Sequence, residues 1–304
     1  MPKIKPSLES CLGSPLSFYG GDVTLRFAKD PYHQYFREEA CGALTHVDGV
    51  TSACGIIDKS QFLVPWSAKM TAEKLLRTMP KVKDELGIEY IDSILWTDFE
   101  ALVLEAKKAH KEKLVDASDV GSAAHAWLED SIRWAITFNN GKVEKLTEQE
   151  PNDHRAKNCG LAALDWMQKH SVKWISTERV VYSKEHNYAG TMDGKAIVDG
   201  VLSIVDWKSS NALRSDYCLQ TSAYQHADIE EFGVPIPDRH ILRLGKEKGD
   251  FEPWHLGPGT IADDFEAFRL CLTLERAHDK LNARIAAGKQ LSAIKKKKEK
   301  NAKS

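Results

Sequence analysis

The sequence predicts an α/β protein in which a central sheet is flanked by helices, with a mostly helical extension at its N-terminus. Three strand-like runs between residues 177 and 208 follow one another closely and are rich in β-branched residues. Segments with the apolar spacing of a helix lie on either side of these runs, at about 153–170 and 216–232. Two further strand-like runs within 241–256 form a second expected hairpin.

The composition is that of a soluble globular protein. The 304 residues are 42% hydrophobic and 28% charged, enough for one large domain or for a core domain with a helical addition. No apolar run approaches the roughly 20 residues that cross a membrane. The first residues, MPKIKPSLESCLGSPLSF, lack the continuous apolar core of a secretion signal. We therefore expect a cytoplasmic protein that does not associate with a membrane.

Charge is unevenly distributed along the chain. From Lys289 onward there are seven lysines and one glutamate, so the net charge of −2 divides into +6 for this end and −8 for the rest. An acidic body is compatible with a carboxylate-rich metal site, and a basic end with phosphate contacts. A solvated, frayed end is the alternative. We expect residues 289–304 to be a disordered basic tail unless the helix predicted from about residue 261 continues into it.

The six cysteines form no recognisable metal-binding or redox motif. They are scattered along the chain, and no pair has the CxxC spacing of a zinc ribbon or a redox centre. We expect them to be reduced and mostly buried as small residues.

The N-terminal region combines short strands with helices. Segments 22–27 and 47–57 are rich in β-branched residues and bounded by glycine, which predicts extended structure. After Pro65 the apolar spacing is helical until Pro80. Thr97 and Glu100 resemble a capping box that opens a helix through about residue 114, and another helix is expected from about residue 118 or 119. The expected division is an extension over 1–117, a core over 118–288 and the tail.

The most informative prediction, the pairing register of two neighbouring strands, comes from a tight turn at Asp199-Gly200. The turn separates strand-like runs at 188–198 and 201–208, and an Asp-Gly pair in this setting favours a type I′ hairpin. In that register, residues whose numbers sum to 399 face each other. Asp193 and Asp206 would then lie directly opposite each other, with Cβ atoms about 5 Å apart.

Two opposed carboxylates with a nearby lysine indicate a metal site. Like charges in cross-strand register are destabilising unless a cation lies between them. Lys208 is two residues beyond Asp206, so it shares the same face of the strand. An exposed, solvated Asp-x-Lys is the alternative, but Ile204 and Val205 indicate a buried strand, where charged residues are usually paired or coordinating. A bulge would shift this register.

Five segments in order strengthen this interpretation. The sequence GSAAHAWLE, then TERVVYS, GTMDG, IVDWKSS and LQTSAYQHA resembles the RecB-type branch of the PD-(D/E)XK nucleases, which includes phage and mitochondrial genome-maintenance exonucleases. The resemblance covers residues 121–227, about a third of the chain. It implies a restriction-endonuclease-like core with a mixed central sheet. Residues 1–117 would then be an extension able to form an arch over the active site.

The resemblance also implies roles for individual residues. A helix beside the sheet would supply a histidine to the metal, and the two aspartates would be its carboxylate ligands. A lysine would orient or polarise the attacking water, while a Gln-x-x-x-Tyr face would support the lysine and touch the phosphate backbone. The matching positions are His125, Asp193, Asp206, the backbone carbonyl of Trp207, Lys208, Gln220 and Tyr224.

Several of these positions have simpler interpretations. Without the motif, His125 would be read as a satisfied core histidine, and Gln220 and Tyr224 as ordinary helix residues. Glu129 and Glu178 are candidates for holding a second metal or a water. Glu129 could instead pair with an arginine one turn later.

The implied activity is that of a Mg²⁺- or Mn²⁺-dependent DNA exonuclease that processes ends in recombination, repair or replication, in a bacterium or a phage-infected cell. The implied partners are DNA with a free end and a single-strand-annealing or replication protein. No iron–sulfur cluster is expected, because only Cys218 and Cys271 follow Asp206, where cluster-bearing relatives have three cysteines. The alternatives are a structure-specific endonuclease, a non-catalytic DNA-binding protein of the same fold, and a hydrolase of another phosphodiester.

The extension contains three aromatic side chains that could stack on bases if it does form an arch. They are Trp66, Tyr90 and Trp96. The alternative for each is a place in the core of the helical extension.

Overall fold

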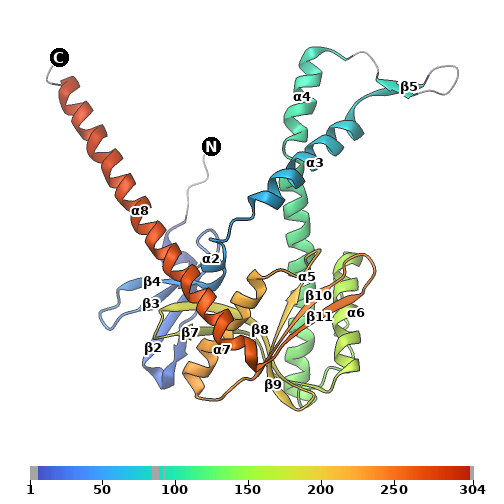
Figure 1. Cartoon of the computed structure of the whole chain (residues 1–304), viewed down its shortest axis with the longest axis vertical. Coiled ribbons are helices and arrows are strands. Elements are labelled where there is room, and N and C mark those ends of the chain that lie inside the picture. The colour runs from blue at the N-terminus through green and yellow to red at the C-terminus, as the bar shows by residue number, and fades with distance from the viewer. Residues whose placement is uncertain (1–5, 84–88, 92–93, 302–304) are drawn as a thin grey trace.

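The computed structural model describes residues 6–83, 89–91 and 94–301, and within them the centre is a nine-stranded mixed sheet (Figure 1). The strand order is β1-β2-β3-β4-β8-β9-β10-β11, and β7 pairs with β8. The β4–β8 and β9–β10 pairs are parallel and the others antiparallel, which confirms the predicted mixed α/β fold. The strands are β1 (Leu16–Phe18), β2 (Val23–Ala28), β3 (Gln34–Glu38), β4 (Leu44–Gly49), β7 (Val172–Ser183), β8 (Tyr188–Val198), β9 (Val201–Lys208), β10 (Asp238–Leu244) and β11 (Phe251–Leu256).

The sheet divides at β8. Along one edge β8 pairs with β7 from Tyr188 to Val198, with no ladder partner at Asp193. Along its other edge, β4 pairs only with Tyr188 and Ala189, whereas β9 pairs with Gly194 through Val198. Among the described strands, residues 190–193 therefore have no ladder partner on this second edge. This interruption is where the cavity described below opens.

The predicted hairpin register is confirmed. Asp199 and Gly200 have φ angles of +49° and +88°, both positive as a type I′ turn requires. The β8–β9 ladder follows the predicted pairing from Val198–Val201 to Gly194–Val205. It ends one position before Asp193 and Asp206, which occupy the next opposed positions.

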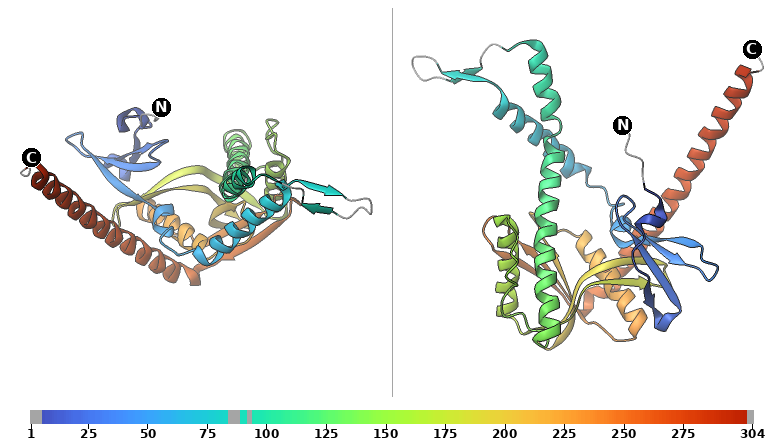
Figure 2. Two further views of the ribbon diagram at one scale, coloured as in Figure 1. Left: turned by 90° about the horizontal axis from the view of Figure 1, so that it is seen from above. Right: turned by 180° about the vertical axis from the view of Figure 1, so that it is seen from behind.

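Helices cover both faces of the sheet. Helices α5 (Ala109–Phe138) and α6 (His154–Lys169) pack on one face. Helices α2 (Val50–Cys54), α7 (Asp216–Phe232) and α8 (Ile261–Asn301) pack on the other (Figures 1 and 2). The ends of two of them follow local rules, because Asp153 caps α6 through the amide of Arg155 at 2.8 Å and Gly233 ends α7 with a φ of +67°.

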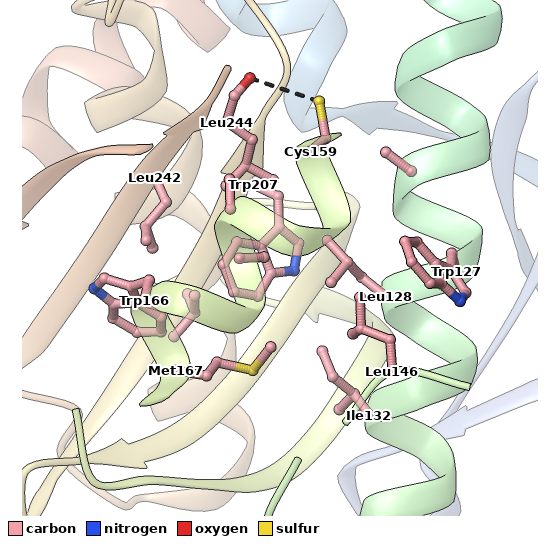
Figure 3. Packing of buried hydrophobic residues seen from close by; sticks show 14 of the residues in the cluster. Trp127, Leu128, Ile132, Leu146, Cys159, Trp166, Met167, Trp207, Leu242 and Leu244 are labelled. Carbon is pink, nitrogen blue, oxygen red and sulfur yellow. Dashed lines mark hydrogen bonds between the residues drawn. The ribbon is translucent and has the colours of Figure 1, made fainter. Parts of the chain in front are cut away.

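The larger hydrophobic core lies between the sheet and the α5–α6 layer. Figure 3 shows Trp207 of β9 between Trp166 of α6 on one side and Leu128 of α5 on the other, and Trp127 of α5 belongs to the same core. Because side chains alternate along a strand, the burial of Trp207 in this core directs its neighbours Asp206 and Lys208 to the opposite face. The core thus fixes the orientation of the strand that carries them.

Two segments project from the sheet. One is an arm formed by α3 (Ser60–Thr78), β5 (Lys81–Lys83), β6 (Glu89–Ile91), α4 (Trp96–Ala106) and the first half of α5; the other is the C-terminal half of α8 (Figures 1 and 2). Lys74 joins the arm helices through Glu105 at 3.6 Å and Glu112 at 3.5 Å. Short helical turns complete the described chain, namely α1 (Leu8–Cys11), η1 (Tyr19–Gly21) and η2 (Pro258–Thr260).

Two expectations for the N-terminal part of the chain are wrong. Segment 47–57 is extended only to Gly49, because Val50 and Ala53 share one helical face and are buried against α7 and α8. No side-chain cap precedes α4, whose first residue is Trp96. The boundary expected between 117 and 118 falls within the continuous helix α5. Helix α8 continues through Asn301, which is the alternative left open for the basic tail. Within the described residues, no helix is long and apolar enough to span a membrane.

Candidate metal centre

A cavity of about 890 Å³ opens where β8 lacks a partner. It is lined by residues of β4, α2, α5, β7, β8, α7 and α8. Among the described residues that line it there are six carboxylates and no lysine or arginine, so the cavity favours cations. The six are Asp48, Glu129, Glu178, Asp193, Glu275 and Asp279.

Three candidate ligands converge at this cavity from three different elements. One ligand atom each from His125 of α5, Glu178 of β7 and Asp193 of β8 lie within 4.8 Å of one another. The Nδ1 atom of His125 is 3.7 Å from Oδ2 of Asp193. The backbone N–H of Trp207 donates to the same Asp193 oxygen at 2.9 Å, which holds the carboxylate in place. An imidazole and two carboxylates form a ligand set for a divalent cation.

Glu178 reaches this group through an unusual backbone conformation. Its φ is +45°, while its neighbours Thr177 and Arg179 remain paired with β8. A residue other than glycine rarely adopts this conformation, which costs of order 1–3 kcal/mol. Burial raises the pKa of Glu178 to about 8, with Asp193 and Glu129 adding to the shift. Glu129 lines the cavity too, but Arg133 pairs with it.

Asp206 is a buried carboxylate whose one ion-pair partner is Lys208. Its side chain is 1% exposed, and Nζ of Lys208 is 2.6 Å from its Oδ2. Within the described part of the chain, neither oxygen has a hydrogen bond of normal geometry. Burial raises the pKa of Asp206 to about 7; Lys208 lowers it and Asp193 raises it. Free lone pairs on a buried carboxylate suit coordination of a cation, since such groups are otherwise hydrogen-bonded.

Lys208 keeps its charge in this surrounding. Burial lowers the pKa of Lys208, but Asp206 and Asp193 outweigh that effect, so the pKa is raised overall. The ammonium also lies 5.1 Å from the ring centre of Tyr217 on α7. Neither Lys208 nor Asp206 lines the cavity itself, so the two lie beside the group formed by His125, Glu178 and Asp193.

Gln220 and Tyr224 lie one turn apart on α7 and both line the cavity. The side-chain amide of Gln220 donates to the hydroxyl of Tyr224 at 2.8 Å. Burial, followed by Asp206 and Asp193, raises the pKa of Tyr224 well above its ordinary value, so the phenol stays protonated. A Cβ at position 190 would lie 2.6 Å from the Tyr224 ring, which explains the glycine in GTMDG.

Three further cavity carboxylates were not singled out from the sequence. Asp48 ends β4, whereas Glu275 and Asp279 lie one turn apart on α8. Arg276 binds Asp48 at 2.7 Å. Burial, then Asp48 and Asp279, raise the pKa of Glu275 to about 7. A signal existed in the i,i+4 spacing on α8, but the partner in β4 is more than two hundred residues away.

The aromatic residues proposed for base stacking differ in their exposure. Trp96 is 74% exposed and its ring centre is 5.7 Å from that of Phe99, so it does not fill a core. Trp66 is half-buried. The side chain of Tyr90 lies outside the described residues.

Comparison with known proteins identifies no family. No family model and no curated protein matches the chain. Among solved structures, the chain is similar to a "putative exonuclease" from Eubacterium rectale, with a TM-score of 0.35 and 16% sequence identity. That similarity covers 53% of this chain and 68% of the other. It is too distant to carry a functional argument, so the function has to be inferred from the site.

Proposed function

We propose that this protein is a metal-dependent nuclease that hydrolyses phosphodiester bonds in DNA. The observation that carries the proposal is the convergence of His125, Glu178 and Asp193 at one cavity, next to the buried Asp206–Lys208 pair. Metal-assisted phosphodiester hydrolysis needs carboxylates to hold a cation and a positive side chain near the reacting phosphate.

His125, Asp193 and Asp206 are the proposed metal ligands, with the carbonyl of Trp207 as a backbone ligand. Glu178 is the proposed additional carboxylate for a second metal or a water, because Glu129 is already paired with Arg133. An oxygen-rich set suits Mg²⁺ or Mn²⁺, and the imidazole gives manganese the advantage. When bound, the cation supplies a water of lowered pKa and charge neutralisation at the phosphate.

The protein's own groups have distinct tasks in this proposal. The ammonium of Lys208 stabilises the negative charge that develops as water attacks the phosphorus. The Trp207 N–H fixes the Asp193 carboxylate by donating to Oδ2, the oxygen that lies 3.7 Å from Nδ1 of His125. Gln220 and the protonated Tyr224 can donate hydrogen bonds to the phosphate backbone at the cavity wall. The acidic lining itself repels a phosphate, so placing the scissile phosphate in the cavity depends on the cation.

A polymer substrate agrees with the position of the cavity. Its lining includes Ala117 and Ser118 near the base of the arm and Asp279 of α8, so it reaches both projecting segments. A strand entering the cavity would pass between these segments. The exposed Trp96–Phe99 pair on the arm is a candidate stacking surface for bases. On these grounds we propose an exonuclease acting on a free end, rather than a structure-specific endonuclease.

The test is an assay on matched linear and closed circular single-stranded DNA with Mg²⁺ and with Mn²⁺. Linear strands should be degraded and circles spared, with nucleotides released from labelled ends. Cleavage of the circles would show an endonuclease. DNA binding without turnover in either metal would favour the non-catalytic alternative, and activity on small phosphodiesters alone would favour a different hydrolase. End processing in recombination, repair or replication, with a single-strand-annealing or replication partner, is the proposed setting.

A further inference from the structure

A second group of metal-binding side chains lies at the far edge of the sheet. Asp238 and His240 belong to β10, and His255 belongs to β11. His240 and His255 are direct cross-strand partners, and one ligand atom from each of the three residues lies within 4.8 Å of the others. The two imidazole rings are stacked, with centres 4.7 Å apart and planes within 11°. Nε2 of His255 is 2.8 Å from Oδ2 of Asp238.

This group is separate from the candidate nuclease centre. The ring of His240 lies 5.7 Å from Trp166 of α6, on the face of the sheet that α5 and α6 cover. Asp206 and Lys208 point to the opposite face. The parallel β9–β10 ladder places His240 beside Val205, whose side chain belongs to the α5–α6 core. A ligand at one site would not touch the other.

We propose that Asp238, His240 and His255 form a binding site for Zn²⁺ or a similar borderline divalent cation. Two imidazole nitrogens and one carboxylate oxygen are a ligand set that suits zinc, with the fourth position open to water. This set is richer in nitrogen than the proposed nuclease centre, so it should discriminate more strongly against Mg²⁺.

The geometry requires the ring of His255 to rotate as well as to move, because a metal ion lies in the plane of each imidazole that binds it and the two ring planes are now within 11°. Two nitrogens at about 2.0 Å from a tetrahedral ion are about 3.3 Å apart, so ligand atoms now within 4.8 Å must approach by at most about 1.5 Å. His255 is the group that can move, because its side chain is 55% exposed. The cation would take the place of the proton that now joins His255 to Asp238. Since β11 is the last strand of the sheet, the bound ion would fasten this edge strand to β10.

Titration calorimetry with Zn²⁺ tests the proposal, comparing the wild-type protein with His255→Ala, Asp238→Asn and the control His154→Ala. His154 is an exposed histidine next to an aspartate at 3.9 Å, without a second imidazole. The wild type and His154→Ala should bind one equivalent more than His255→Ala. Asp238→Asn should lower the affinity for Zn²⁺ at that site at least about tenfold, since even residues that only hydrogen-bond to a metal ligand contribute about 10–100-fold to affinity.

Two further measurements complete the test. Zn²⁺ should raise the thermal midpoint of the wild type more than that of His255→Ala. Cleavage of DNA with Mg²⁺ should be the same in both proteins, so a failure of this site is distinguishable from a failure of the nuclease assignment. Equal stoichiometry and affinity for Zn²⁺ in the wild type and His255→Ala would overturn the proposal.

Discussion

Two clusters of buried charged side chains, one around Lys195 and one around Asp193, lie two residues apart on β8 and differ in net charge. Around Lys195 the charges cancel, because Lys195 and Arg179 bind Asp228, and Arg179 also binds Glu231. Around Asp193 they do not cancel. Among the described residues, the carboxylates of Glu178, Asp193 and Asp206 are accompanied by Lys208 and by His125, which is charged only when protonated.

The difference separates a structural network from a candidate site. Buried charges are tolerated when each is paired, and an unpaired excess is strongly unfavourable. The Lys195 cluster satisfies this rule with side chains of the protein. The Asp193 cluster satisfies it only if a cation is added or if a carboxyl takes up a proton. The pKa values of Asp206 and Glu178 are raised, so in the metal-free protein these carboxyls take up protons.

The largest effect is expected from substitutions in the Asp193 cluster, whose charges do not cancel. Asp206→Ala or Lys208→Ala should abolish cleavage, with a loss of at least about 10²–10³-fold, because each removes charge stabilisation at the reacting phosphate. Folding, followed by circular dichroism, and DNA binding should remain largely intact. In Lys208→Ala the carboxyl of Asp206, whose pKa burial already raises, can take up a proton in place of its lost partner. Turnover at the normal rate in either variant would refute the assignment of both residues, and His154→Ala serves as the active control.

Breaking the balanced cluster should damage stability instead. Asp228→Asn leaves Lys195 and Arg179 without the carboxylate they share, and Asp228 is 0% exposed. Removing one partner of a buried ion pair costs about 3–5 kcal/mol. Urea unfolding measures this loss, while the specific activity of the folded protein should be retained. Asp165→Asn, which breaks an exposed pair with Lys169, should cost less than about 1 kcal/mol.

Proton release sharpens the comparison further. The pKa values of Asp206, about 7, and Glu178, about 8, lie above those of an unfolded chain, so the folded metal-free protein holds extra protons between about pH 4 and pH 8. Their contribution to stability is therefore present at low pH and is lost as pH rises through this window. Cation binding must displace these protons, so affinity for Mn²⁺ should rise with pH.

Calorimetry at pH 7 in two buffers of different ionisation enthalpy measures this exchange. The apparent binding enthalpy should differ between buffers by the equivalent of about one proton. Identical enthalpies would mean that the carboxyls are already ionised before the cation binds. The same titration on Asp228→Asn should retain the buffer dependence.

The smallest expected effect is a trade between stability and activity. Glu178→Gln removes a buried carboxylate whose pKa is raised by burial and by Asp193 and Glu129, so the metal-free variant should be more stable at pH 8, by about 1 kcal/mol after allowance for solvent screening. Cleavage should fall at the same time. A variant that is less stable in urea and equally active would show that Glu178 has no part in the cation site.

The sequence predicts the centre of this molecule well because its determinants are local. The Asp199-Gly200 turn sets the β8–β9 register, and the bounds expected for these strands and for α7 agree with the structure. The positive φ of Glu178 has no local signal, so its place beside His125 and Asp193 depends on the folded sheet. Asp48 and Glu275 meet only through the packing of α8 on the body, which periodicity does not specify.

Two N-terminal expectations, the extended segment 47–57 and a helix start near Ser118, failed for a different reason, whereas β2 and α3 agree with the predicted strand at 22–27 and helix before Pro80. A β-branched run is compatible with both a strand and a short buried helix, and only the neighbouring α7 and α8 make Val50 helical. Likewise, Ser118 and Asp119 suit the start of a helix, but the apolar residues that precede them continue α5 without a break.

Helix α5 has a mechanical consequence. It runs unbroken from Ala109, in the arm, to Phe138, and its buried residues begin at Val120. His125 therefore lies about 24 Å along this helix from Ala109, the end that belongs to the arm. A tilt of this helix about its buried half would swing the arm and displace the imidazole together. A partner that binds the arm and tilts α5 would therefore also shift the His125 imidazole, which is proposed to hold the cation.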